Sequence, residues 1–449
     1  MIYESAQGNI TIAVAGDAMI TRPMRMYQER SFLNLVNLLK SADASVVNLE
    51  MLFHDYEMSW EYKDTVSFQV SEPDNITELQ WMGFDVVTTA NNHSYDYSEA
   101  GFLKTLANCR ERGLKQAGGG SDLDHARAPA YLDTAGGRVA VMSATTTFSK
   151  DSPAGFGRPD FPGKPGVNAL RHNVMHHVER DVFDALQKAN RELGFRETEM
   201  AARQFHPVNV DEYDPRRELR FMGGKFSLSE ECSVTTACNK DDLAGIGNWI
   251  RGANKAADWP IYGVHCHESG QVGEFHGASR IAPPSFLEEF AHFSIDQGCS
   301  LFFAHGPHFL RGIEIYKNRP IFYSLGNFIF QNETVQWVPE PVYRGLNLGD
   351  EHNPGDWGLA RSGGEQFGFA ADPVFYRSVV ALCDYRNGDL KQIRLHPIDL
   401  GFKQPMSQRG RPVLAEGPVA QQALTWLQQV SKPYGTEISI EDGVGIIRL

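Results

Sequence analysis

The chain repeatedly places a short apolar run directly before carboxylate, amide or imidazole side chains, and this pattern constrains its fold more than any other feature. The runs are residues 10–15 before Asp17, 44–48 before Glu50, 85–90 before Asn92 and His93, 260–265 ending in His265, and 300–304 before His305 and His308. Stretches with helical periodicity, such as 31–41, 99–112 and 285–297, separate the runs. This alternation of strands and helices predicts an α/β layered fold.

The polar residues at the run ends indicate a metal site. In open α/β sheets, ligands gather beyond the carboxyl ends of the strands. A mixture of carboxylate, amide and imidazole donors suits Zn²⁺, Mn²⁺ or Fe²⁺, and a bridging carboxylate can hold two such ions roughly 3.5–4 Å apart. Each residue alone has an ordinary role open to it, such as helix capping for Asp17 or a surface ion pair for Glu50. Their coincidence at strand ends favours one shared site.

Other histidines are weaker candidates for the site. His267 lies two residues beyond His265, on the same face if that strand continues, and His276 lies further along. A helix is predicted over residues 172–193. The spacing of its three histidines, at 172, 176 and 177, is more typical of a solvated helix face than of a metal site, because no acidic partner accompanies them.

The regular alternation lapses in two places. Residues 150–258 are richer in Pro, Gly and charge, which predicts an inserted peripheral lobe that lies partly over the site. Residues 336–369 hold few apolar runs and many glycines, as lids and binding loops often do. With 449 residues, we expect a single catalytic domain over 1–449 that carries both insertions.

Composition narrows the class of protein. The formal net charge is −14 and no basic block is present, so nucleic-acid binding is not expected. No segment reaches the ~20 apolar residues that span a bilayer, and no signal peptide is recognisable at the start. Six scattered cysteines without a C-x-x-C pair favour free thiols in a cytoplasmic protein.

Five motifs carry a family resemblance. They are Gly16-Asp17 with Arg22, Asn48-Leu49-Glu50, Ala90-Asn91-Asn92-His93 with Asp96, the turn Gly118-Gly119-Gly120, and the block His305-Gly306-Pro307-His308 followed by Tyr323 to Phe328. Together they resemble CapA-type proteins of poly-γ-glutamate capsule synthesis, a branch of the calcineurin-like metallophosphoesterases. The resemblance covers most of the chain and is weakest over 150–258 and 336–369.

The resemblance implies a four-layer α-β-β-α sandwich with the metal residues on one rim. It implies metal ligation by Asp17, Glu50, Asn92, His265, His305 and His308, and catalytic roles for His93, Asp96 and Arg22. Met19 stands where the wider superfamily has a histidine, and His267 could replace that lost ligand. We therefore expect one or two ions, Mn²⁺ or Zn²⁺, with Fe also fitting the donor set.

The expected function is metal-dependent hydrolysis through an activated water, of either a phosphoester or an amide such as a γ-glutamyl or cyclic amide. His93, oriented by Asp96, is the expected general acid, and Arg22 is expected to grip an anionic group. The alternative is a non-catalytic partner in polyglutamate synthesis or binding. We expect no membrane partner, and a homo-oligomer remains open.

The predicted loop 336–369 also bears on the substrate. It carries the aromatic residues Trp337, Tyr343 and Trp357, and two arginines, Arg344 and Arg361, which can pair with an oxyanion in bidentate geometry. This composition favours a lid over a small anionic substrate. A disordered surface loop is the alternative.

Overall fold

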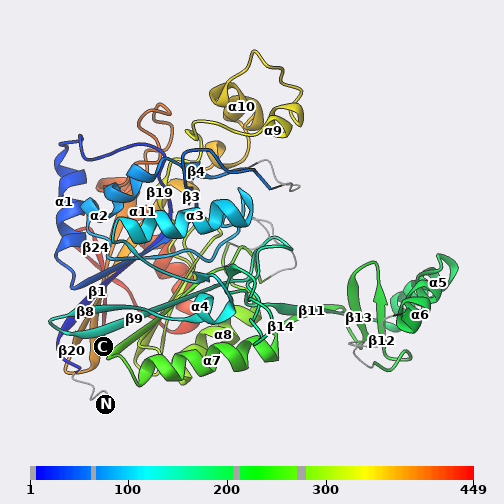
Figure 1. The fold of residues 1–449 in the computed structure, drawn as a ribbon. Helices are drawn as coiled ribbons and strands as arrows, with labels where there is room; N and C mark the ends of the chain where they lie inside the picture. Colours follow the sequence, from blue (N-terminus) through cyan, green and yellow to red (C-terminus); the bar gives the residue numbers. More distant parts are fainter. Residues whose placement is uncertain (1–6, 62–66, 206–212, 271–279) are drawn as a thin grey trace.

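A computed structural model describes residues 7–61, 67–205, 213–270 and 280–449 of the chain (Figure 1). The candidate His276 lies outside these residues. Within them, a ten-stranded mixed sheet forms the first half of the body. Its strands run in the order β23 (Ser439–Glu441), β24 (Val444–Arg448), β21 (Asp389–Asp399), β20 (Arg377–Arg386), β1 (Ile10–Met19), β2 (Ala44–Leu49), β5 (Val86–Thr88) and β6 (Lys115–Ala117), with β19 (Asn327–Phe330) beside β1 and β22 (Val413–Leu414) beside β21.

A six-stranded sheet forms the second half. Its order is β17 (Ile313–Tyr316), β18 (Arg319–Phe322), β16 (Leu301–His305), β15 (Trp259–His265), β9 (Gly137–Thr145) and β8 (Ala130–Thr134). Two short sheets complete the body, β3 (Leu52–Phe53) with β4 (Val70–Ser71) and β7 (Gly119–Gly120) with β10 (Gly166–Val167).

Alternating side chains place a core between the two sheets and one on each outer face. In β1, Ile12 and Val14 enter the core between the sheets, whereas Ala13 and Ala15 face the outer helices. In β9, Val141 points inward and Met142 outward. Helices α1 (Arg30–Lys40) and α2 (Ile76–Met82) cover the large sheet, and α7 (Lys240–Asn254) and α8 (Ser285–Asp296) cover the small one. The predicted α/β class is confirmed.

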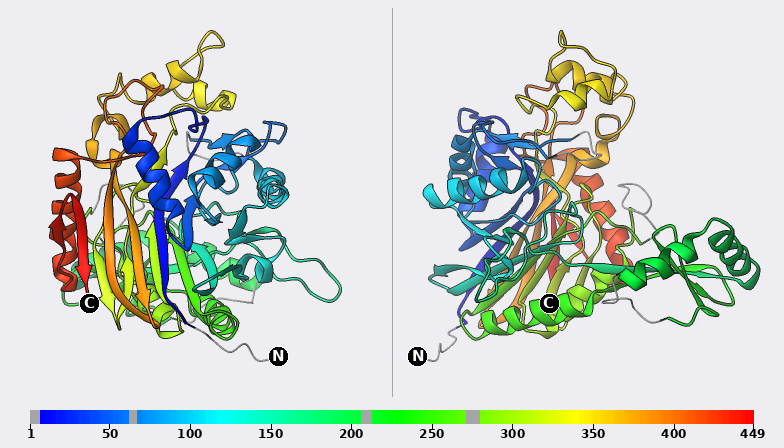
Figure 2. Two further views of the ribbon diagram at one scale, coloured as in Figure 1. Left: turned by 90° about the vertical axis from the view of Figure 1, so that its left-hand side faces the viewer. Right: turned by 45° about the vertical axis from the view of Figure 1, so that its right-hand side comes forward.

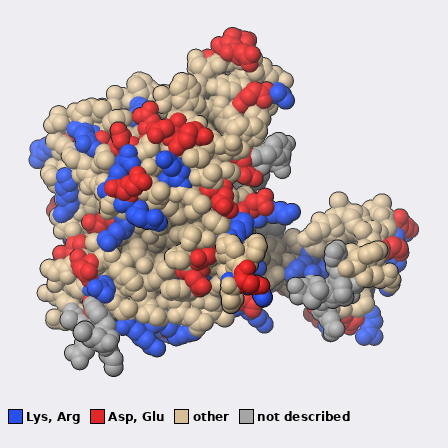
Figure 3. Space-filling model, in the orientation of Figure 1, with Lys and Arg blue, Asp and Glu red and all other residues tan. Residues whose placement is uncertain are grey.

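Three further helices pack at the edges of the body. They are α3 (Ser98–Glu111) against β3 and β6, α4 (Leu123–Arg127) against β7 and β10, and α11 (Gly417–Ser431) against β20 and β21. Within the described residues, no helix has both the length and the apolar composition needed to cross a membrane. On the face shown in Figure 3, acidic and basic side chains are intermixed without an extended basic area.

Part of the predicted lobe forms an arm that projects from the body (Figures 1 and 2). Its four-stranded sheet has the order β12 (Glu218–Phe221), β13 (Gly224–Leu228), β11 (His172–Val178) and β14 (Ser233–Cys238), and it carries α5 (Arg180–Glu192) and α6 (Phe195–Phe205). The prediction of one helix over 172–193 is wrong in its first part. Residues His172–Val178 pair with β14 and β13, and the helix begins only at Arg180.

The start of the predicted lobe stays close to the body, because the Tyr95 hydroxyl donates to the Pro165 carbonyl at 2.7 Å. The segment 336–369 is also more ordered than the sequence suggests. It contains the helices α9 (Glu340–Arg344) and α10 (Pro354–Arg361), and Asn353 caps α10 in a capping box. Val342 and Trp357 are buried against Leu52 and Val70 of the body, so this segment has its own small core.

Candidate metal centre

The strand ends of the two sheets meet at one rim. Asp17 on β1 lies in register with Asn48 on β2, and Glu50 follows β2 directly. In the other sheet His265 ends β15 and lies in register with His305, which ends β16. Parallel neighbours place their carboxyl ends at the same edge, so these side chains converge although their elements are distant in sequence.

Asp17 is fully buried and bonded to several partners. Its Oδ1 accepts from Asn48 Nδ2 at 2.8 Å and lies 3.2 Å from His305 Nδ1. Its Oδ2 accepts from the Gly306 backbone N–H at 3.0 Å and lies 3.4 Å from His308 Nδ1. The carboxylate therefore ties the two sheets together at the rim.

Glu50 differs from Asp17, because both of its carboxylate oxygens are buried and neither has a hydrogen-bond partner among the described residues. Imidazole nitrogens surround it at somewhat longer range. His265 Nε2 lies 3.7 Å from Oε1, and His308 Nδ1 lies 3.7 Å from Oε2. His267 and His93 each place Nε2 3.9 Å from Oε1. A buried carboxylate without donors is costly unless a cation accompanies it.

The histidines contact one another through ring nitrogens. His265 Nε2 lies 2.9 Å from His267 Nε2, and His265 Nδ1 lies 3.1 Å from His305 Nδ1. The Nε2 atom of His305 is buried without a partner among the described residues. A neutral imidazole has a single N–H, so ring protons alone cannot satisfy this many converging nitrogens. Nitrogen lone pairs that face one another around carboxylates fit a shared cation.

The donor set therefore fits divalent metal ions. Three groups of residues each place ligand atoms within 4.8 Å of one another: Asp17, His265 and His305; Glu50, His265 and His267; and Asp17, Glu50 and His308. His267, a weaker candidate in the sequence, belongs to one of these groups. The prediction that buried Asp, Glu and His residues of this chain form a group able to bind metal is confirmed, and the identity of the metal stays a prediction.

The two carboxylates have opposite electrostatic environments. Burial, reinforced by the charges of Asp17 and Asp96, raises the pKa of Glu50 well above its ordinary value. Burial also acts to raise the pKa of Asp17, but hydrogen bonds from His265, His305 and His308 outweigh it and hold that pKa well below its ordinary value. Burial lowers the pKa of His265 to about 3, although Asp17 opposes this effect. A neutral His265 keeps a lone pair available for a metal.

His93 lies beside the cluster on the loop after β5. Its Nδ1 lies 2.7 Å from Asp96 Oδ2, and its Nε2 faces Glu50. Asp96 is itself held by the Gln69 backbone N–H at 2.6 Å. The loop is anchored because Asn91 Nδ2 donates to the Leu49 carbonyl at 2.7 Å. The side-chain oxygen of Asn92 is buried without a partner among the described residues, as expected for a ligand atom.

Close backbone packing supports the rim. A Cβ on Gly16 would lie 1.8 Å from the Gly326 carbonyl oxygen, so only glycine allows β1 to approach this turn. His308 has a φ of 65°, which is uncommon for a residue with a side chain. Such a conformation persists where the surrounding structure enforces it and is often found at functional sites.

Arg22 has different surroundings from those that its motif suggests. Its Nη2 donates to the Arg409 carbonyl at 3.1 Å, and its Nη1 donates to the Ser407 carbonyl. These contacts bind the guanidinium to the chain itself. A role for Arg22 in gripping a substrate stays a prediction.

Two recesses lie near the rim, and they share Arg280 and Asp372 in their walls. The first, here named the α10 recess, has a volume of about 430 Å³ and is lined by Asn332, Trp357, Arg361 and Phe369 among others. The Phe369 ring packs edge-on against the ring of His308, with 5.2 Å between centroids. The α10 recess is therefore adjacent to the metal centre.

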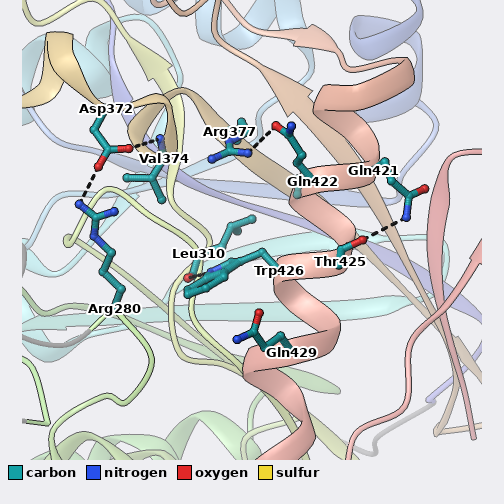
Figure 4. A pocket seen from close by; sticks show the side chains of 11 residues that line it. Arg280, Leu310, Asp372, Val374, Arg377, Gln421, Gln422, Thr425, Trp426 and Gln429 are labelled. Carbon is teal, nitrogen blue, oxygen red and sulfur yellow. Dashed lines mark hydrogen bonds and ion pairs between the residues drawn. The ribbon is translucent and has the colours of Figure 1, made fainter.

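The second, named the α11 recess, has a volume of about 420 Å³ and lies against α11 (Figure 4). Arg377 and Trp426 line it. Of the residues singled out in segment 336–369, Trp357 and Arg361 reach the α10 recess, whereas Trp337 is 56% exposed and Arg344 pairs with Glu340 on the surface.

Some residues of the site were not singled out from the sequence. Asn48 orients Asp17 through a hydrogen bond. The sequence feature that could have identified Asn48 is its place two residues before Glu50 in the second motif. Glu268 is buried and accepts from Thr146 Oγ1 at 2.6 Å and Thr147 Oγ1 at 3.1 Å, directly behind His267. Its only signal was its position after two candidate histidines. Phe369 had no signal, because its contact with His308 depends on the tertiary fold.

Comparison with known proteins shows the family of the chain. The family described as "Bacterial capsule synthesis protein PGA_cap" matches residues 11–332, which include every candidate ligand. The chain belongs to this family. The resemblance to CapA-type proteins seen in the sequence is thereby confirmed.

Three relatives of this PGA_cap chain span different shares of its length. Two proteins named uncharacterized, y4sH and y4uA of Sinorhizobium fredii (strain NBRC 101917 / NGR234), are each 34% identical to it over 98% of this chain and 93% of their own length. A capsule biosynthesis protein CapA of Bacillus anthracis is 22% identical over 72% of this chain and 60% of its own length. The alignments with the two Sinorhizobium fredii proteins extend across the arm and the segment 336–369.

Proposed function

We propose that this PGA_cap chain is a metal-dependent hydrolase that acts on a small anionic substrate, a phosphoester or an amide. The observation that supports it most directly is the Glu50 carboxylate, which is fully buried, lacks hydrogen bonds among the described residues and is ringed by imidazole nitrogens. The proposal includes the four-layer sandwich of the metallophosphoesterase type, supported by two stacked sheets with helices outside both.

In this proposal Glu50 would be a ligand to one or two ions. Asn92, His265 and His267 would complete one set of ligands, and Asp17, His305 and His308 the other. Bound Mn²⁺, Zn²⁺ or Fe²⁺ supplies an electrophilic centre and acidifies water. The chain itself fixes the geometry, because Asn48 and the Gly306 N–H hold Asp17, while the buried walls exclude bulk water.

His93 is the proposed proton donor to the leaving group. Its contact with Asp96 places a proton on Nδ1, so Nε2 is the atom that faces the cluster and exchanges a proton there. Asp96 orients the ring through this contact. A proton donor held in this way beside the cluster is what a hydrolase requires, and this supports catalysis over binding alone.

A second candidate function is a non-catalytic role in polyglutamate synthesis or binding. It is favoured by the family description and by the name of the Bacillus anthracis relative, both of which refer to capsule synthesis. The two candidates differ in one measurable property, since only the first requires turnover of a small substrate.

The test combines metal analysis with a hydrolysis panel. We expect protein purified without chelators to contain transition metal by inductively coupled plasma mass spectrometry. We also expect it to hydrolyse at least one phosphoester, γ-glutamyl amide or cyclic amide in the presence of Mn²⁺ or Zn²⁺. Metal without turnover on the whole panel would favour the binding role. Absence of both metal and metal-stimulated turnover would refute the hydrolase.

A further inference from the structure

The α10 recess contains polar groups that the folded chain leaves unsatisfied. Trp357 is 2% exposed, yet its indole N–H has no acceptor among the described residues. The side-chain oxygen of Asn332, a residue 5% exposed, is likewise buried and unbonded. Buried donors and acceptors are nearly always paired in native proteins. The lack of a protein partner for these two groups therefore points to a partner from outside the chain.

Arg361 supplies the charge for such a partner. Its guanidinium lies over the Trp357 ring, 5.4 Å from the centroid, and forms no ion pair with a described residue. Burial lowers the pKa of Arg361 from its ordinary value, with the nearby Glu333 charge opposing that effect. A stacked guanidinium presents its edge as a rigid pair of donors, and this geometry matches a planar oxyanion.

The acidic residues of the α10 recess are already committed to other cations. Glu333 pairs with Arg409 at 2.7 Å. Asp372 pairs with Arg280 at 2.7 Å and also accepts from the Val374 backbone N–H at 3.0 Å. Among the described residues that line the recess, Arg361 is therefore the cation without a counterion.

The α11 recess provides the contrast, because its arginine Arg377 and its indole N–H on Trp426 are both hydrogen-bonded (Figure 4). Arg377 donates to Gln422 at 2.7 Å, and the Trp426 indole N–H donates to the Leu310 carbonyl at 2.8 Å. Gln421 donates to Thr425 at 3.0 Å. Two recesses of similar volume thus share a wall, but only the α10 recess combines an uncommitted arginine with an unpaired indole N–H.

We propose that the α10 recess binds a carboxylate of the substrate, distinct from the group that is hydrolysed, through Arg361 and the indole N–H of Trp357. The inference rests on the proposed hydrolase function, since Phe369 connects the recess to His308. Two guanidinium N–H groups and one indole N–H match the two oxygens of a carboxylate. A phosphate, with three acceptor oxygens and a greater charge, would leave acceptors unpaired there.

The test measures binding rather than turnover, so that it is separate from the test of catalysis. Glutarate is titrated into the full-length chain by isothermal calorimetry, with neutral glutaramide and inorganic phosphate as matched probes. Each probe is also titrated into Glu50→Gln, which removes the central carboxylate of the metal centre. We expect glutarate to bind the parent chain and Glu50→Gln with similar affinity, and to bind more tightly than either other probe.

Variants then locate the site. We expect Arg361→Gln to weaken glutarate binding by about tenfold or more, because the charged donor pair is lost. Trp357→Phe keeps an aromatic ring under Arg361 but replaces the indole by a smaller ring without the N–H, so we expect a loss of a few fold. Arg361→Lys keeps the charge without the planar donor pair, and its affinity is expected between those of the parent chain and Arg361→Gln. Arg377→Gln in the α11 recess is the matched control and should leave binding unchanged.

Several outcomes would overturn the proposal. They are equal binding of glutarate and glutaramide, tighter Arg361-dependent binding of phosphate, equal losses in Arg361→Gln and Arg377→Gln, and no glutarate binding at all. Loss of binding in Glu50→Gln with retention in Arg361→Gln would place the carboxylate at the metal centre and would equally refute the α10 recess. A failed hydrolysis panel, in contrast, would leave these titrations interpretable.

Discussion

Two sets of histidines lie on strands of this chain but have different surroundings. At the rim, His265 and His267 stand two residues apart at a strand end and face the buried carboxylates of Asp17 and Glu50. In the arm, β11 carries His172, His176 and His177, but His172 stacks on Phe286 and His177 contacts Thr235 and Ser227. The comparison teaches that an imidazole becomes a candidate ligand through a buried carboxylate beside it, and not through spacing alone.

The largest expected effect comes from removing the carboxylate that distinguishes the two sets. We expect Glu50→Gln to lose most bound metal and to lower turnover by more than about 100-fold, since even outer partners of metal ligands typically contribute 10–100-fold. Metal content and kcat/KM are the measurements. His176→Gln in the arm is the matched control and should change neither. Equal effects of the two substitutions would remove the basis of the comparison.

A second substitution separates the proton donor from the ligands. We expect His93→Ala to lower kcat by about 10²–10⁴-fold while metal content stays at the parent level. Asp96→Asn should cause a smaller loss, because the ring remains but its orientation is weakened. Steady-state kinetics beside metal analysis gives both quantities. If His93→Ala releases the metal, the residue acts as a ligand and the proposed role is incorrect.

A third histidine tests what burial does without a close carboxylate. Burial, followed by the charge of Arg394, lowers the pKa of His396 on β21 to about 4, while Asp384 opposes this. The unfolded chain binds a proton at this residue near pH 6.5, and the folded chain does so only near pH 4. Stability from a neutral His396 is therefore present above about pH 6.5 and is lost as pH falls toward 4.

The expected loss across that window is at most about 3 kcal/mol of unfolding free energy. Urea denaturation at several pH values measures it. Leucine in His396→Leu cannot titrate. We therefore expect the unfolding free energy of the parent to fall relative to that of the variant as pH falls from 6.5 to 4. A difference independent of pH would show that His396 does not contribute through protonation.

The smallest effect is expected from removing most of the arm, together with His176 and His177. Val174 on β11 lies opposite Thr236 on β14, so residues 175–235 can be replaced by a two-residue Asn-Gly turn. We expect metal content and kcat/KM to stay within about twofold, because the described ligands all lie in the body. Size-exclusion chromatography of the same protein would reveal whether the arm contributes to assembly. A loss of metal in this variant would connect the arm to the rim.

The sequence predicts the body well because two independent signals agree there. Short apolar runs mark β1, β9 and β15, and polar residues follow the strands where the carboxyl ends meet. Asp17 and His305 belong to different sheets, and their convergence at one rim is what the family resemblance, rather than strand alternation, implies. Neither signal specifies which nitrogen faces which oxygen. The sequence therefore does not predict that the Glu50 carboxylate lacks hydrogen-bond donors among the described residues, which only the structure shows.

The arm was harder to predict because local signals there are weak. The strong helical pattern of residues 180–192 predicts a helix that also includes residues 172–178. Pairing with β14 and β13 instead makes residues 172–178 a strand. The many glycines and few apolar runs of segment 336–369 likewise indicate a lid-like loop rather than helices. Its two short helices are stabilised by burial of Val342 and Trp357 against Leu52, a contact absent from the local sequence.

The hydrogen bond from the Gly306 backbone to Asp17 joins residues 289 positions apart. A chain made from its N-terminus at 5–20 residues per second needs about 15–60 s to add that many residues. During this interval Asp17 and Glu50 have been synthesised, whereas His305 and His308 have not. In the proposed function, metal loading would therefore be a late event in the life of the nascent protein, with the ion supplied after most of the body has been translated.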